Sequence, residues 1–275
     1  MARVPGVCRG LLFLMMSVVR AHAEDDVAAP AAVTTAPSVT AAANVTEYHA
    51  SIGPGFYALP NFPGAQRTRR ILFPFIDADY ANRFYTSASD ILGVYGYKTT
   101  DTQVGAAVEY DLTERMSRDD IRLRGLPNVA ETPRFKLFGS QTVGAVTADV
   151  NVARDIAGRG QGTLGQANVW LTVPFDPAFS VSVGPGITWA DSQYMHTFYA
   201  ITPAEAAVSA FPVFASRAGI ADAHLNGLAE WVIHSKYRLG AQACFAHLRG
   251  AAAASPITVQ HEQTTLVGWL AYRFN

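Results

Sequence analysis

The chain has 275 residues and a formal net charge of −1, and only 16% of its residues are charged, against about a quarter in ordinary soluble domains. It has no basic excess, so we expect no nucleic-acid partner. Two cysteines, Cys8 and Cys244, are too few for a disulfide framework or a cysteine-rich zinc site.

Residues 1–23 have the organisation of a secretory signal peptide. Two arginines precede an apolar run at residues 10–19, and a small-x-small site follows, in which Ala21 and Ala23 are the predicted cleavage residues. A membrane-spanning helix needs about 20 apolar residues, so this shorter run predicts a cleaved leader rather than an anchor. We therefore expect the protein to be exported.

Residues 24–46 are predicted to be a flexible tail. Ala, Pro, Thr and Val dominate this low-complexity stretch, which has too few large side chains to form a core. The remaining part, residues 47–275, is where a folded domain is expected.

From residue 47 onward, segment after segment alternates between two faces with a period of two residues. In residues 219–233, one face is free of charge. The opposite face carries four polar candidates for the interior: Asp222, His224, Asn226 and Glu230. The same alternation recurs in residues 102–112, 163–175 and 237–249 and in the last ten residues.

These segments favour an all-β fold, a closed antiparallel transmembrane β-barrel. A strand that crosses a bilayer needs about 9–11 residues, whereas strands in soluble proteins average five or six. A barrel is also the sheet form that satisfies every backbone polar group in lipid. The alternative is a secreted β-sandwich, which predicts shorter strands and turns every 8–12 residues.

The spacing of short turns and long loops predicts twelve strands. Short turns are typical of the periplasmic end of such barrels, long loops of the external end, and termini on one side require an even number of strands. The predicted strands are 47–59, 69–80, 83–89, 91–98, 102–112, 133–141, 143–154, 162–175, 179–193, 217–234, 237–249 and 263–274. If 83–98 were a single kinked strand, ten strands would be the alternative.

The polar inner faces allow two interpretations. The four candidates in 219–233, with Glu109, Asp111, Asp149 and Asn151, could form a metal or substrate site, but a small barrel also needs polar side chains and water to fill its interior. We favour the second interpretation. No GxSxG nucleophile elbow is present, so we expect neither an enzyme nor a cofactor.

The stretch from Trp189 to Thr202 is dense in aromatic side chains. Trp189 ends an apolar outer face, which suits the aromatic girdle where a strand leaves the membrane. The following aromatics and Met195 are predicted to pack as a loop core over the barrel mouth, and residues 203–206 to form a short helical turn.

The C-terminus has the aromatic ending typical of outer-membrane proteins. Tyr272 and Phe274 lie on one face of the last predicted strand, and such an ending is the expected insertion signal for the barrel-assembly machinery. Asn275 follows Phe274, which departs from the usual aromatic last residue.

From residue 184 onward the sequence resembles the MipA/OmpV family of MltA-interacting outer-membrane proteins. The residues that carry this resemblance are Gly184, Pro185, Trp189, Ala190, Asp191, Tyr194, Met195, Thr197 and Phe198. Shorter matches lie at residues 123–126, 202–203, 255–257 and 272–274, whereas residues 209–211 depart from the Ser-Gly-Leu frequent in the family.

The resemblance implies a location in the outer membrane of a Gram-negative bacterium, in contact with its lipid. It also implies a scaffold in peptidoglycan remodelling, which bridges a lytic transglycosylase and a penicillin-binding synthase. The polar inner faces keep open an alternative, a porin-like channel for small solutes.

Overall fold

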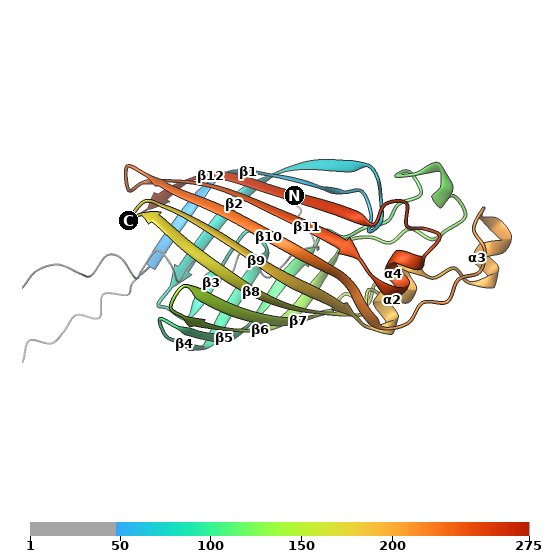
Figure 1. The fold of residues 1–275 in the computed structure, drawn as a ribbon, viewed down its shortest axis with the longest axis horizontal. Helices are drawn as coiled ribbons and strands as arrows, with labels where there is room; N and C mark the ends of the chain where they lie inside the picture. The colour runs from blue at the N-terminus through green and yellow to red at the C-terminus, as the bar shows by residue number, and fades with distance from the viewer. Residues whose placement is uncertain (1–47, 275) are drawn as a thin grey trace, which may run out of the picture.

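The computed structural model describes residues 48–274, which form a closed β-barrel of twelve antiparallel strands (Figure 1). Each strand pairs with its neighbours in sequence, and β1 pairs with β12 to close the barrel. The predicted signal peptide and tail lie outside the described residues, as does Asn275. No helix in this part of the chain is long and apolar enough to cross a membrane.

The predicted fold class and the count of twelve strands are confirmed. The strands are β1 (Tyr48–Pro60), β2 (Thr68–Tyr80), β3 (Phe84–Thr86), β4 (Asp90–Lys98), β5 (Thr102–Asp111), β6 (Thr132–Val143), β7 (Val146–Asp155), β8 (Thr163–Asp176), β9 (Phe179–Ala190), β10 (Gly219–Ile233), β11 (Tyr237–Leu248) and β12 (Glu262–Phe274). Residues 83–98 do contain two strands, so the ten-strand alternative is wrong.

Several strand boundaries differ from the prediction by one to three residues, and two local differences have a clear structural cause. The turn between β6 and β7 lies at residues 144–145, because Gly144 has a φ of +60° and adopts the left-handed conformation that the turn needs. At the external end of β10, a bulge between Ile220 and Asp222 reverses the alternation. Ile220 therefore faces outward and Ala221 inward, the opposite of the sequence pattern.

The outer wall is apolar along its length. Leu72 has 84% of its side chain exposed and Val150 58%, values that suit contact with lipid rather than water. Exposed aromatic side chains gather on this wall at the end where the short turns lie: Tyr48, Tyr80, Phe84, Tyr97, Phe175, Trp231, Tyr237 and Phe274. They form the aromatic girdle expected at a membrane–water interface.

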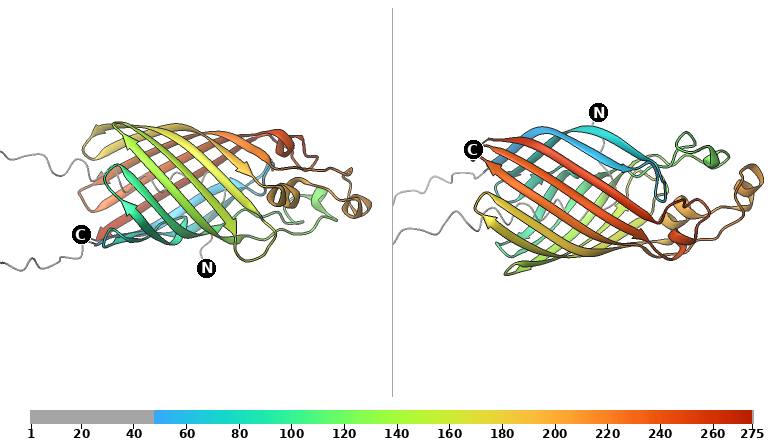
Figure 2. Two further views of the ribbon diagram at one scale, coloured as in Figure 1. Left: turned by 90° about the horizontal axis from the view of Figure 1, so that it is seen from below. Right: turned by 45° about the horizontal axis from the view of Figure 1, so that its top comes forward.

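The two ends of the barrel are built differently (Figures 1 and 2). The first residues of β1 pair with the last residues of β12, so both ends of the described chain lie at the end with the short turns, which is the periplasmic one. Long loops at the external end contain the 3-10 helix η2 (Ile121–Leu123) and the helices α2 (Ser192–Tyr199), α3 (Pro203–Val208) and α4 (Gly250–Ala254).

Inside the barrel, large rings lie over glycines of the neighbouring strand. The directly paired residues are Phe73 with Gly55, Tyr85 with Gly93, Phe138 with Gly105 and Trp269 with Gly240. A Cβ atom at Gly240 would lie 1.9 Å from the Trp269 ring. The glycines thus make room for aromatic side chains on a closely packed inner wall.

Candidate functional site

A hydrogen-bonded polar network lies on the inner wall across β8, β9 and β10. Asp222, His224 and Asn226 are all buried on the inner face of β10. Nδ1 of His224 lies 2.7 Å from Oδ1 of Asp222, and Nε2 lies 2.9 Å from Oδ1 of Asn168 on β8. The Asn226 amide donates to the same Asn168 oxygen at 3.3 Å.

The roles of these groups follow from Asp149 on β7. Its carboxylate accepts from Nδ2 of Asn168 and from Nε1 of Trp170, both at 2.8 Å. Because a carboxylate only accepts, the amide nitrogen of Asn168 must face Asp149, which leaves its oxygen to accept from His224. His224 thus donates from Nε2 to Asn168, and its Nδ1 shares a second buried hydrogen bond with Asp222.

Gly186 on β9 makes this network possible. It pairs directly with Asn168 on one side and with His224 on the other. A Cβ at position 186 would lie 2.1 Å from the Asn168 oxygen and 2.3 Å from Nε2 of His224. The two side chains therefore meet across the middle strand because residue 186 has no side chain.

Glu230, the fourth inward candidate, belongs to a different cluster. It accepts from Arg238 at 3.1 Å, and Arg238 also donates to Asp77 at 3.0 Å. This cluster lies near the periplasmic end of β10, several residues from His224. The four inward residues thus do not form one site, and no group of three His, Cys, Asp or Glu side chains within residues 48–274 is arranged to hold a metal ion.

At the external end, helix α2 covers the barrel mouth. Asp191 caps the helix by accepting from the backbone N–H of Tyr194 at 2.8 Å. The helix buries four side chains, Tyr194, Met195, Phe198 and Tyr199, against residues of the barrel wall and of α4. These side chains do form a core over the mouth, but on a helix rather than on the loop predicted from the sequence.

The residues that carry the family resemblance come together at this place. Gly184 and Pro185 lie on β9, Trp189 faces outward with 40% exposure, and Ala190 is fully buried at the end of the strand. Thr197 on α2 donates to the carbonyl of Gly160 at 2.6 Å, which ties the helix to the loop between β7 and β8. The motif therefore describes how β9 turns into the helix that covers the mouth.

Two buried arginines fasten the external loops. Arg134 on β6 donates to Asp111 at 2.7 Å and to the carbonyl of Gly162 at 2.9 Å. Arg115, in the loop between β5 and β6, donates to the carbonyl of Phe198 at the end of α2 at 2.8 Å. Burial lowers the pKa of Arg115 to about 10, against the opposing effect of Glu205, so Arg115 keeps its charge near neutral pH.

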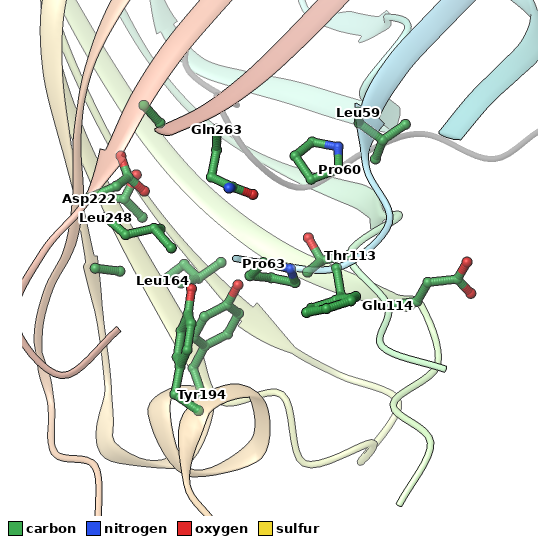
Figure 3. A pocket seen from close by; sticks show the side chains of 15 residues that line it. Leu59, Pro60, Pro63, Thr113, Glu114, Leu164, Tyr194, Asp222, Leu248 and Gln263 are labelled. Atoms are coloured by element: carbon green, nitrogen blue, oxygen red, sulfur yellow. The ribbon is translucent and has the colours of Figure 1, made fainter. Parts of the chain in front are cut away.

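A mainly apolar pocket lies beneath α2, between the wall and the loop that joins β1 to β2 (Figure 3). Tyr194 and Gln263 point into it, while the carboxylate of Glu114 is directed away and pairs with Arg69. The hydroxyl groups of Thr113 and Thr188, both lining residues, make no hydrogen bond within the described residues. The pocket belongs to the packing of the external cap.

The sequence placed Asp149 on an inner face but did not show which inward side chains meet. The inward positions on β10 were visible as alternation, but Asn168 and Asp149 lie on other strands and are joined to them only through the register. Helix α2 had a signal in the sequence: its four buried side chains are spaced i, i+1, i+4 and i+5, as on one face of a helix.

The protein is an outer-membrane β-barrel. This class is defined by long strands that close into a barrel, an apolar outer wall and an aromatic girdle. The chain also matches the family described as "MltA-interacting protein MipA" over residues 52–274. It therefore belongs to the MipA family, as its sequence motifs indicated.

Other proteins of known structure resemble the chain only distantly. No curated protein sequence shows significant similarity to the chain. Among solved structures, the NanC porin has 6% identity and a TM-score of 0.42, with 81% of this chain and 98% of the porin covered. An outer-membrane channel from Pseudomonas putida F1 has 12% identity and a TM-score of 0.40, with 88% and 100% covered.

Proposed function

We propose that the protein is an outer-membrane scaffold in peptidoglycan remodelling, which holds a lytic transglycosylase near a penicillin-binding synthase. The observation that supports this most is membership of a family described as MltA-interacting. A barrel in the outer membrane presents its short turns to the periplasm, where murein enzymes act. The partner surface would then comprise the turns at residues 81–83, 99–101, 144–145, 177–178 and 234–236.

The scaffold is proposed to have no catalytic activity of its own. His224 is buried on the inner wall, and both of its ring nitrogens are engaged, by Asp222 and Asn168. A general base needs a ring nitrogen free to take a proton from its substrate. The polar network is therefore better suited to holding β8 and β10 in register than to catalysis.

A binding experiment tests the scaffold. The folded barrel, immobilised in detergent, is exposed to a purified MltA-type lytic transglycosylase and to a bifunctional penicillin-binding protein, separately and together. We expect each to bind and the barrel to retain both at once. The proposed surface is wrong if both enzymes still bind after the periplasmic turns are replaced by Asn-Gly and binding is lost only when the external loops are changed. The scaffold is refuted if neither enzyme binds.

The polar inner face still favours a second candidate, a porin-like channel for small solutes. Lumen-facing residues such as Gln103, Asn151 and Gln242 are hydrophilic, as in a water-filled pore. Planar-bilayer recording separates the two functions. Steady single-channel conductance from the purified barrel would support the channel, and a silent bilayer that contains inserted barrel would support the scaffold.

We also propose that export removes residues 1–23 and that the last strand directs insertion. Mass spectrometry of the mature N-terminus tests cleavage after Ala23, and replacement of Ala21 and Ala23 by Arg should leave the precursor uncut. The outward-facing rings of Tyr272 and Phe274 are 5.0 Å apart. Phe274→Ala should reduce the heat-modifiable, folded fraction in outer-membrane extracts, whereas deletion of Asn275 should not.

A further inference from the structure

Charges on the outer wall are confined to one end of the barrel. In the described strands, the outward-facing positions carry charged or histidine side chains only at Arg70, Arg154, His247 and Glu262. All four lie where β2, β7, β11 and β12 meet the external loops. Arg249 directly follows β11 and continues its pairing, since its N–H donates to the carbonyl of Ala221 at 2.8 Å.

The position of Arg70 matches the upper edge of a membrane. Ten residues separate it from Tyr80, which lies in the periplasmic aromatic girdle on the same face of β2. Ten residues span about 33 Å along a strand, which at a tilt of about 40° is a height of about 25 Å, the height of the apolar band on such barrels. Arg70 is therefore placed at the level of the outer-leaflet head groups.

These outward arginines differ in their partners from two cations inside the barrel, Arg134 and Arg238. Inside the barrel, Arg134 pairs with Asp111 and Arg238 with Asp77 and Glu230. No carboxylate of residues 48–274 forms an ion pair with Arg70, Arg154 or Arg249, and all three are exposed. Of the acidic and histidine groups on the same rim, Glu262 faces His247 at 3.3 Å.

We propose that Arg70, Arg154 and Arg249, the arginine rim, bind the phosphate groups of a phosphorylated glycolipid in the outer leaflet. A guanidinium group presents several N–H donors in one plane, which matches two phosphate oxygens at once. The side chains leave the apolar wall at head-group level, so a lipid whose acyl chains lie against Leu72 or Val152 would bring its phosphate within their reach. The rim thus gives the outer surface of the barrel a preference for one leaflet.

Native mass spectrometry of the detergent-folded barrel tests this proposal, with bis-phosphorylated lipid A as the probe. The double variant Arg70→Gln/Arg154→Gln is compared with Arg83→Gln/Lys236→Gln, which removes two exposed cations from the periplasmic turns. We expect the rim variant to bind lipid A about tenfold more weakly than the wild type, and the periplasmic variant to bind it within about twofold. Adding Arg249→Gln should weaken binding further.

Three outcomes would overturn the proposal. One is a rim variant that binds lipid A as tightly as the wild type. Another is an equal loss in the periplasmic variant, which would show a general effect of net charge. The third is full competition by inorganic phosphate at millimolar concentration, which would show a site for the free anion rather than for a lipid. Heat-modifiable migration establishes that both variants are folded before the comparison is made.

Discussion

The two ends of the barrel differ in the sequence separation of the contacts that hold them together. At the periplasmic end, turns of two or three residues join strands that are consecutive in sequence, and residues 81, 82, 234 and 235 adopt positive φ angles to make them. At the external end, Arg115 reaches the carbonyl of Phe198, and Ser255 donates to the carbonyl of Tyr199. The periplasmic end is therefore built by contacts between residues close in sequence, whereas the external cap depends on segments far apart in the chain.

This difference suggests how the protein divides its tasks. Short turns with few side chains leave the periplasmic end open to a large partner, as the proposed scaffold requires. The external end instead buries an ionic and aromatic cap under α2. We expect substitutions in the cap to cost much more stability than substitutions in the turns.

The largest effect is expected for Arg134→Ala, which removes a fully buried cation and leaves Asp111 buried. Breaking a buried ion pair costs about 3–5 kcal/mol. Urea unfolding followed by tryptophan fluorescence gives the free energy. Arg118→Ala, at a guanidinium that is 71% exposed, is the control and should change it by less than about 0.5 kcal/mol. An equal decrease in the free energy of unfolding for the two variants would show that burial of the charge does not determine the effect.

Gly162→Ala should come second. Gly162 has a φ of +55°, and an added Cβ would lie 2.1 Å from the carboxylate of Asp191, which caps α2. Left-handed strain adds about 1 kcal/mol and overpacking about 1–3 kcal/mol. Gly158→Ala is a matched control, since its φ is +68° but nothing lies within 4 Å of the added atom. Gly158→Ala should therefore lower the free energy of unfolding only by the backbone strain, as measured in the same experiment.

A smaller loss, about 1 kcal/mol, is expected for Asp191→Ala, because an N-cap hydrogen bond is removed from α2. Asp191→Asn keeps an acceptor and should be close to the wild type. Hydrogen exchange of the amides in residues 192–199 measures this local opening. Unchanged exchange in Asp191→Ala would show that the buried aromatic face alone holds the helix.

The smallest effect, and one of opposite sign, is expected at the periplasmic end. Ala81 and Asn82 are the central residues of a β-turn closed by the bond from the Arg83 N–H to the Tyr80 carbonyl, and both have positive φ angles, 55° and 52°, for which Asn-Gly is the favoured pair. Ala81→Asn with Asn82→Gly should stabilise the barrel by about 0.5–1 kcal/mol in urea unfolding. Ala178→Gly, in a turn where that residue has no positive φ, should be neutral or slightly destabilising.

The same contrast explains how much could be predicted from the sequence. Alternation over long segments gave the barrel, and the breaks in alternation gave twelve strands with both ends in the periplasm. The helical turn predicted at residues 203–206 is part of α3, where Thr202 and Glu205 form a capping box with Pro203 at the first position. Each of these features is encoded by residues close together in the chain.

What could not be predicted depends on register and on distant segments. The bulge at Ile220 shifts one side chain from the inner to the outer face, and no local residue marks it. Helix α2 contains three aromatic residues and one β-branched residue among eight, so propensity does not predict it; only the spacing of its buried side chains indicates a helix, and its formation rests on the surface it buries. The bond between His224 and Asn168 requires knowing that β8, β9 and β10 are adjacent and how they are aligned.

Gly186 has a consequence for how this family can vary. Its missing side chain is the gap through which His224 reaches Asn168, so a larger residue there is incompatible with the bond. Relatives that carry a side chain at this position should also have lost the histidine or the asparagine, and those that keep both should keep the glycine. We therefore expect positions 168, 186 and 224 to vary together among relatives, although 56 residues separate Asn168 from His224 in the chain.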